Sequence, residues 1–270
     1  MKVSSTYIHG INPAEQNRLT ILNSLLNDRC IEKIPIHSGA RILDVGSGLG
    51  LMTAAFAEKA GANSYVLGIE RSEAQLQKAQ SIQTPGLHFR KGDAFQLPLT
   101  PEEEGTFDLV FARFILEHLP EPQRAIKEMF RALKPGGTIV LADDDHEAMI
   151  LYPEPAGFKM LWSAYIDSYL EIGNDPFIGR KLPRLLIDNG FINVRNDVAF
   201  FGDVAGSPTF QAYILNLSEV IATARDVMFE NNLIESDDFE SALNNLKSWS
   251  NIDHATAFYP LCMAFGKKPE

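Results

Sequence analysis

The sequence has 270 residues, of which 45% are hydrophobic and 22% charged. These fractions are typical of a folded globular protein and exclude a disordered or fibrous chain. Lysine and arginine number 24 against 35 aspartates and glutamates, a net charge of −11. A phosphate backbone would be repelled by that charge on average, and the cations are scattered, so we predict no nucleic-acid partner.

Two cysteines far apart in the sequence, Cys30 and Cys262, argue against a disulfide framework and favour a reducing compartment. The first ten residues do not have the apolar core of a secretory signal, and no run of 18 apolar residues exists to span a membrane. We therefore expect a cytoplasmic protein without a membrane partner. The sequence leaves open whether it is a monomer or a homodimer.

The first expected helix opens at Asn12-Pro13-Ala14-Glu15, a sequence that resembles a capping box with proline at the first helical position. Leucines recur at helical spacing from Leu19 to Leu26, and the helix is expected to run to about Asp28. We assign residues 1–38 to an N-terminal helical cap.

Residues 40–145 alternate between short apolar runs and amphipathic stretches, which predicts a parallel sheet covered by helices on both faces. The expected strands are 42–45, 65–69, 87–91, 107–111 and 138–142. The expected helices are 51–61, 73–83 and 121–133, the last closed by Lys134-Pro135-Gly136-Gly137.

The rest of the chain is mainly helical, with predicted helices at 158–172 and 182–189 and within 207–246. Two more strands are expected at 191–201 and 257–265. We predict a single domain, with its core at 40–205 and 255–267 and a helical substrate lid at 147–178 and 207–250.

A glycine-rich segment, Gly46-Ser47-Gly48-Leu49-Gly50, follows the first strand and opens a helix. Glycines there permit positive φ and let a ligand approach the backbone, and the N–H groups of the helix start favour an anionic group. The G-x-G-x-G spacing differs from the G-x-G-x-x-G of dinucleotide folds. Taken alone, the segment is also explained as a tight strand-to-helix turn.

Two acids stand at the ends of the next two strands. Glu70 ends the second strand, where a carboxylate accepts hydrogen bonds from both hydroxyls of a ribose. Asp93 ends the third, where it can accept from the exocyclic amine of an adenine beside the backbone of Ala94. Three nucleoside-compatible groups at successive strand ends indicate a ligand site at the carboxyl edge of the sheet.

With these motifs the chain resembles class I S-adenosylmethionine-dependent methyltransferases, in a subgroup that acts on small molecules. The resemblance rests on ILDVGSGLG (42–50), GIE (68–70), GDAFQLP (92–98), FDLVFARFILEHL (107–119) and LKPGGTIVLAD (133–143), in order and spacing. It extends outward to YIHGINPAEQNRL (7–19) and FIGRKLPRLLIDNGF (177–191). The family fold is a Rossmann-like α/β sheet of seven strands, mostly parallel with an antiparallel last strand.

The resemblance implies S-adenosylmethionine as cofactor, with S-adenosylhomocysteine as product, and a set of binding residues. Glu70 would bind the ribose, Arg71 would cover the adenine, and Asp93 with Ala94 would hold the adenine edge. The residues expected to border the methionine portion or the ribose are Gly46, Ser47, Gly48, Gly50, Ala112 and Arg113. We further expect the first helix to close over the cofactor, with Tyr7 and Arg18 near its carboxylate.

Methyl transfer from a sulfonium needs positioning of the nucleophile and, for some substrates, removal of one proton. His146, after the fifth strand, is the candidate base, oriented by a neighbouring carboxylate. A structural role is expected for His118, which lies in an apolar turn. Asp143, Asp144 and Asp145 raise the possibility of a Mg²⁺ site, but consecutive side chains diverge, so we predict no metal.

The substrate is expected to be a small molecule attacking through nitrogen, oxygen or carbon. Aromatic residues of the insertions are candidates for its pocket, with Arg180 as a polar contact, although such a stripe is also explained as core. The candidate substrate residues are Tyr152, Trp162, Tyr165, Arg180 and Tyr213. Two alternatives stay open: a protein that binds S-adenosylmethionine without transferring methyl, regulatory or catalysing a rearrangement, and a nicotinamide-dependent oxidoreductase.

Overall fold

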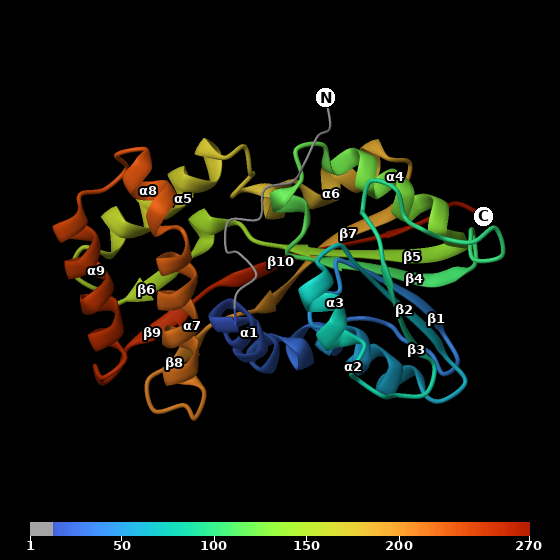
Figure 1. Cartoon of the computed structure of the whole chain (residues 1–270), viewed down its shortest axis with the longest axis horizontal. Helices are drawn as coiled ribbons and strands as arrows, with labels where there is room; N and C mark the ends of the chain where they lie inside the picture. Colours follow the sequence, from blue (N-terminus) through green and yellow to red (C-terminus); the bar gives the residue numbers. More distant parts are fainter. Residues whose placement is uncertain (1–12) are drawn as a thin grey trace.

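The computed structural model describes residues 13–270 of the chain, with side chains from residue 16 onward. Seven strands form the central sheet in the order β3-β2-β1-β4-β5-β10-β7 (Figure 1). In that order they span Leu87–Lys91, Tyr65–Glu70, Arg41–Val45, Phe107–Arg113, Leu133–Asp143, Pro260–Lys267 and Ile192–Phe200. The first five strands in this order, from β3 through β2, β1 and β4 to β5, are parallel, and β10 is antiparallel to both β5 and β7. The predicted fold class is confirmed.

Helices cover both faces of this sheet, as its apolar strands require. One face carries α4 (Pro122–Ala132) and α6 (Ile178–Asp188), and the other carries α1 (Pro13–Ile31), α2 (Leu51–Ala60) and α3 (Glu73–Ala79) (Figure 1). The sheet face under α4 and α6 has its own core, which contains Phe107, Ile126 and Leu182. The strands therefore hold their carboxyl ends, where ligands bind in such sheets, in fixed positions.

A cap extends from one end of the sheet, at the left of Figure 1. It contains α5 (Phe158–Glu171), α7 (Phe210–Thr223), α8 (Arg225–Glu230) and α9 (Ser236–Trp249). Its buried side chains, such as Tyr165 and Trp249, belong to the same hydrophobic cluster as Phe56 of α2 and Phe111 of β4. Because the cluster is continuous, the cap is packed onto the core and not tethered to it by a linker.

The cap also holds a small antiparallel sheet that the sequence analysis does not predict. Its order is β6-β9-β8, with bounds Ile150–Tyr152, Thr256–Phe258 and Asp203–Val204. The expected last strand at 257–265 is therefore two strands: β9 pairs within the cap, and β10 pairs with the central sheet. Helix α3 ends earlier than the expected 73–83, since both the N–H and the hydroxyl of Ser81 bond to the carbonyl of Lys78.

Two short 3₁₀ helices complete the frame of the site. The first, η1 (Leu116–His118), follows β4, and the second, η2 (His146–Ala148), follows β5. Both start just beyond the carboxyl ends of neighbouring central strands, so they face the crevice between the sheet and the cap. The N–H of Leu116 donates to the carboxylate of Asp143, which ties the two segments together.

Candidate functional site

The glycine loop after β1 turns sharply at the edge of the sheet. Gly46, Gly48 and Gly50 have φ values of 76°, 55° and 77°, in the left-handed region that favours glycine. The N–H groups of Gly46 and Ser47 both donate to the carbonyl of Ile69. The loop is thereby fixed to β2, and its backbone faces the adjoining cavity.

That cavity has a volume of about 220 Å³ and lies along the carboxyl ends of β1, β2, β3 and β4. Eight residues of the predicted cofactor site line it: Gly46, Ser47, Gly48, Glu70, Arg71, Asp93, Ala94 and Arg113. The structure therefore brings together side chains from four strand ends, as the strand order predicts.

Glu70 and Asp93 are held in place by backbone N–H donors. The two carboxylate oxygens of Glu70 accept from Gly48 at 2.9 Å and from Ser72 at 2.7 Å. Oδ1 of Asp93 accepts from Phe95 at 2.8 Å. Each oxygen keeps a second lone pair, so both carboxylates can still accept bonds from a ligand.

Gly50 and Ala112 are predicted cofactor residues that do not line this cavity. Gly50 begins α2 at a point where a Cβ would lie 2.5 Å from Cζ of Phe89, so its glycine is required by packing. Ala112 is buried within the sheet beneath α4. Both support the site from behind without facing the cavity.

Asp44 lines the cavity and was not among the predicted binding residues. It is buried under the glycine loop and accepts a hydrogen bond from Thr53 of α2 at 2.6 Å. Burial raises the pKa of its carboxyl to about 6, although the bond from Thr53 opposes that shift. Its position inside the ILDVG motif was the only sequence signal for it.

Helix α1 forms one wall of the cavity through Leu19, Leu22 and Asn23. Arg113, at the end of β4, fastens this wall: its guanidinium donates to Oδ1 of Asn23 at 2.9 Å and of Asn27 at 2.8 Å. Arg18 instead lines a second cavity and donates to Oδ1 of Asn216 on α7 at 3.1 Å. Tyr7, its predicted companion, lies outside the described residues.

The second cavity, of about 80 Å³, adjoins the first on the side of the cap. The two share four lining residues: Leu19, Leu22, Phe114 and His118. Of the predicted substrate and catalytic residues, His146, Trp162, Tyr165 and Tyr213 line the second cavity, together with Tyr169 and Tyr259. Its walls are therefore rich in aromatic side chains.

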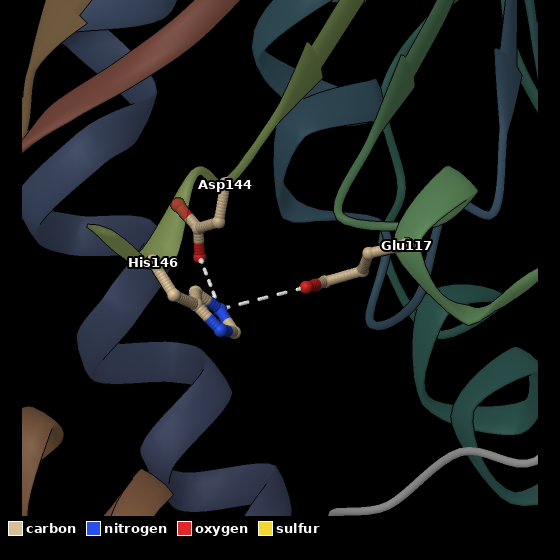
Figure 2. Close-up of side chains that lie close together, drawn as sticks. All are labelled: Glu117, Asp144 and His146. Carbon is tan, nitrogen blue, oxygen red and sulfur yellow. Dashed lines mark ion pairs between the residues drawn. The ribbon is translucent and has the colours of Figure 1, made fainter. Parts of the chain in front are cut away.

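Three ionisable side chains converge in this second cavity (Figure 2). Glu117 comes from η1, and Asp144 and His146 come from the segment after β5. Nε2 of His146 lies 3.7 Å from Oε2 of Glu117 and 3.8 Å from Oδ2 of Asp144. We call these residues the Glu117–Asp144–His146 cluster. One potential ligand atom from each lies within 4.8 Å of the others.

Burial sets the charge state of the cluster. It raises the pKa of Glu117 well above the usual range, and the nearby carboxylates of Asp143 and Asp144 raise it further. Burial also raises the pKa of Asp144 to about 7 and lowers that of His146 to about 3. The imidazole of His146 is thus a weak base, and the carboxylates are the stronger proton acceptors of the cluster.

His118 lies beside the cluster and lines both cavities. Its Nε2 lies 3.4 Å from Oε1 of Glu117, and its Nδ1 lies 3.1 Å from Nδ2 of Asn174. If the amide of Asn174 donates to Nδ1, then Nε2–H of His118 faces Glu117. Burial lowers the pKa of His118 to about 3, so the ring is neutral. These contacts agree with the predicted structural role.

Sequence reasoning missed Glu117, whose signal was a single acid inside the apolar run Phe114–Leu119. It also selected two residues that the structure places elsewhere. Tyr152 is 71% exposed on β6 and lines neither cavity. Arg180 pairs with Asp145 and Glu147 on the outer side of the loop. We therefore leave Tyr152 and Arg180 out of the substrate site.

Comparison with known proteins gives the family. Residues 36–163 match the family profile of a methyltransferase domain. A demethylmenaquinone methyltransferase of Staphylococcus aureus is 30% identical over 191 residues, which cover 66% of this chain and 78% of that protein. An uncharacterized 37.1 kDa protein in transposon TN4556 of Streptomyces fradiae is 28% identical over 164 residues; these cover 60% of this chain but 46% of the transposon protein.

Among solved structures, the fold is similar to that of a putative methyltransferase of Haloferax volcanii, solved in complex with the methyltransferase activator Trm112. The TM-score is 0.63 at 15% identity, with full coverage of both chains. The chain belongs to the class I S-adenosylmethionine-dependent methyltransferases, and S-adenosylmethionine is its cofactor. Family membership speaks against a nicotinamide-dependent oxidoreductase.

The first cavity fits this cofactor. The hydroxyl of Ser47 is buried at its edge without a hydrogen-bond partner among the described residues, and the loop glycines leave its backbone accessible. Glu70 would hold the ribose hydroxyls, and Asp93 with Ala94 would hold the adenine edge. Bound here, the cofactor supplies an activated methyl group. No helix within residues 13–270 has the length and apolar character needed to cross a membrane.

Proposed function

We propose that the protein transfers a methyl group from S-adenosylmethionine to a small molecule held in the second cavity. The observation that carries this proposal is the sharing of Leu19, Leu22, Phe114 and His118 between the two cavities. A molecule in the second cavity would meet the cofactor without crossing solvent. In support, the relatives include enzymes named for demethylmenaquinone, itself a small molecule.

The chain's own residues would position the substrate and exclude water. Trp162, Tyr165 and Tyr169 of α5 are buried and pack against one another, so together they form a wall against which a flat or apolar group can pack. Asp144, with a pKa of about 7, would accept a proton from the nucleophile more readily than His146. We assign His146 the role of orienting the carboxylates.

We also propose the segments 147–178 and 207–250 as the substrate lid, because α5 and α7 supply most of the aromatic wall. A cytoplasmic location is part of the same proposal. It is supported by Cys30 and Cys262, both free thiols in the structure.

The test is formation of S-adenosylhomocysteine from S-adenosylmethionine in the presence of a panel of small amines, phenols, carboxylates and quinols. We expect turnover with at least one class and a gain of one methyl mass in the product. Trp162→Ala should lower kcat/KM about tenfold or more while leaving the Kd for S-adenosylhomocysteine unchanged. Tyr152→Ala, outside the cavity, is the matched control.

Tight cofactor binding with no methylated product across the whole panel would contradict the proposal. That outcome would favour the alternative of a protein that binds S-adenosylmethionine without transferring its methyl group. An equal fall in kcat/KM in Tyr152→Ala and Trp162→Ala would contradict the assignment of the second cavity as the substrate site.

A further inference from the structure

The second cavity contains two buried carboxyl groups and one guanidinium among its described lining residues. Glu117 and Asp144 face into it, and Arg18 is the single lysine or arginine among its described lining residues. Oε2 of Glu117 and Nδ1 of His146 are buried and have no hydrogen-bond partner within the described part of the chain. A buried acceptor without a donor costs free energy, so this cluster is arranged for a ligand that supplies donors and positive charge.

The spacing of the cluster can be compared with that expected for two kinds of cation. A divalent transition metal or Mg²⁺ binds its ligands at about 2.0–2.3 Å, so neighbouring ligand atoms lie about 3.0–3.5 Å apart. An ammonium nitrogen holds its acceptors at about 2.8 Å in tetrahedral directions, which separates them by about 4.6 Å. The observed separations of 3.7 and 3.8 Å, within an overall limit of 4.8 Å, lie between these values and nearer to those of a metal site, so spacing alone does not select the cation. The aromatic side chains that line the same cavity favour an organic ammonium over a hydrated metal ion.

From the two buried carboxyl groups, the unpartnered Oε2 of Glu117 and the aromatic lining, we propose that the Glu117–Asp144–His146 cluster binds the ammonium group of the substrate, and that the protein is an N-methyltransferase of a small amine. The inference rests on the proposed function, which it narrows from any nucleophile to nitrogen. It also assigns Glu117 and Asp144 as the residues that select the amine.

Aromatic rings surround the same point. The ring centroid of His146 lies 4.8 Å from that of Tyr169, 5.4 Å from Tyr165 and 5.5 Å from Trp162. The face of such a ring attracts a cation that lies within about 6 Å of its centroid, more strongly where water is excluded. The rings also pack against an apolar body, so the preferred substrate is an amine carrying an aromatic or aliphatic group.

The reaction balances without a further reactant. One N–H bond of the ammonium breaks and its proton passes to the carboxylate of Asp144 or Glu117, which frees the nitrogen lone pair. The nitrogen then forms a bond to the methyl carbon as the carbon–sulfur bond breaks and its electron pair stays on sulfur. The products are the methylated ammonium, S-adenosylhomocysteine and a protonated carboxyl group, which returns its proton to solvent.

The test compares amines with alcohols of the same shape. The whole protein, saturated with S-adenosylhomocysteine, is titrated calorimetrically with three pairs: propylamine and propanol, 2-phenylethylamine and 2-phenylethanol, tryptamine and tryptophol. We expect at least one amine to bind about tenfold or more tightly than its alcohol, the effect of a charge-assisted hydrogen bond. No preference for the amine in any pair would overturn the inference.

Variants test whether the cluster causes the preference for the amine over the alcohol. Glu117→Gln and Asp144→Asn keep side-chain size and should each reduce the amine preference about tenfold, with an unchanged Kd for S-adenosylhomocysteine. Glu147→Gln, an exposed acid of the neighbouring η2 that pairs with Arg180, is the matched control and should keep it. If either cluster variant fails to fold, the wild-type pairs still decide. A preference that survives both variants would contradict the assignment.

Two further arms separate the possible failures. Titration of the wild-type protein with Mn²⁺ or Zn²⁺ alone should give no stoichiometric binding. If the wild type binds one of these ions and Glu117→Gln does not, the cluster is a metal centre and the inference is overturned. Replacing S-adenosylhomocysteine by S-adenosylmethionine tests transfer itself. Selective amine binding without a methylated amine would leave the inference standing and contradict the proposed function. Methylation of a phenol or of a carbon atom, with no preference for amine binding, would support the proposed function and contradict this inference.

Discussion

Oε2 of Glu70 accepts a hydrogen bond from the N–H of Gly48 at 2.9 Å, while Oε1 of the same carboxylate accepts from Ser72 at 2.7 Å. One side chain therefore joins the glycine loop after β1 to the turn that starts α3. The same carboxylate lines the cofactor cavity. We propose two tasks for it, to shape the loop and to accept bonds from the ribose.

Replacing Glu70 by glutamine should weaken binding of S-adenosylhomocysteine by about 10- to 100-fold, because the amide turns an N–H donor toward a backbone N–H and removes the charge. Calorimetric titration measures the change. Glu73→Gln is the control: that carboxylate is 56% exposed and pairs with Lys91 away from the cavity. A Kd for the Glu70 variant within twofold of wild type would contradict the assigned role.

Gly48 and Gly50 should respond differently to alanine. At Gly50 a Cβ would lie 2.5 Å from Phe89 and 2.9 Å from Ala79, so Gly50→Ala should lower the free energy of unfolding by about 2–5 kcal/mol. At Gly48 the space is wider, since a Cβ would lie 3.6 Å from Gln75, and the cost should be about 1–2 kcal/mol. Gly48 faces the cavity, so its variant should lose more cofactor affinity.

Denaturant unfolding and calorimetric titration of both variants check this contrast. Equal losses of stability would show that Phe89 and Ala79 move aside for the Cβ of Gly50. Unchanged affinity in Gly48→Ala would show that the loop backbone does not approach the ligand.

The lining of the first cavity was largely predictable because its signals are local. Glycines after β1, Glu70 after β2 and Asp93 after β3 each stand beside the strand that positions them, and the strand order brings the three together. The Glu117–Asp144–His146 cluster depends on contacts between distant segments: Glu117 meets Asp144 and His146 only because β4 and β5 are adjacent. The small cap sheet was missed for a similar reason, since β8 has two residues and β6 three, too few for a periodic pattern.

Arg113 should control how firmly α1 closes the cofactor cavity. Its guanidinium donates to Asn23 and Asn27 and lies 3.7 Å from the sulfur of Cys30, all on α1. Arg113→Met removes these bonds at similar length and should weaken S-adenosylhomocysteine binding about tenfold. Amide hydrogen exchange in α1 should accelerate as well. Arg184→Met, 77% exposed on α6, is the control, and equal exchange in both variants would contradict the role of Arg113.

Asp144 makes the stability of the ligand-free protein depend on pH. Its pKa is about 7 in the folded chain against an ordinary value of 3.8, because burial and the nearby charge of Asp145 disfavour ionisation against the opposing effect of Arg18. Between these values the folded state binds more protons than the unfolded state. The stabilisation that Asp144 contributes is therefore fully present below pH 4. It is lost as the pH rises toward 7, and the free energy of unfolding falls by at most about 4 kcal/mol as a result.

Asp144→Asn should flatten this decline. Glu117 and Asp143, whose pKa values are also raised by burial, and Asp44 will keep part of it. Asparagine also removes a negative neighbour of Glu117, which lowers the pKa of that carboxyl. The remaining decline in the free energy of unfolding should therefore end at a lower pH. Urea unfolding at pH 5, 6, 7 and 8 measures the difference, with Glu147→Gln as control. Parallel stability curves for wild type and Asp144→Asn would mean that the Asp144 carboxylate is not held in an environment that resists its ionisation.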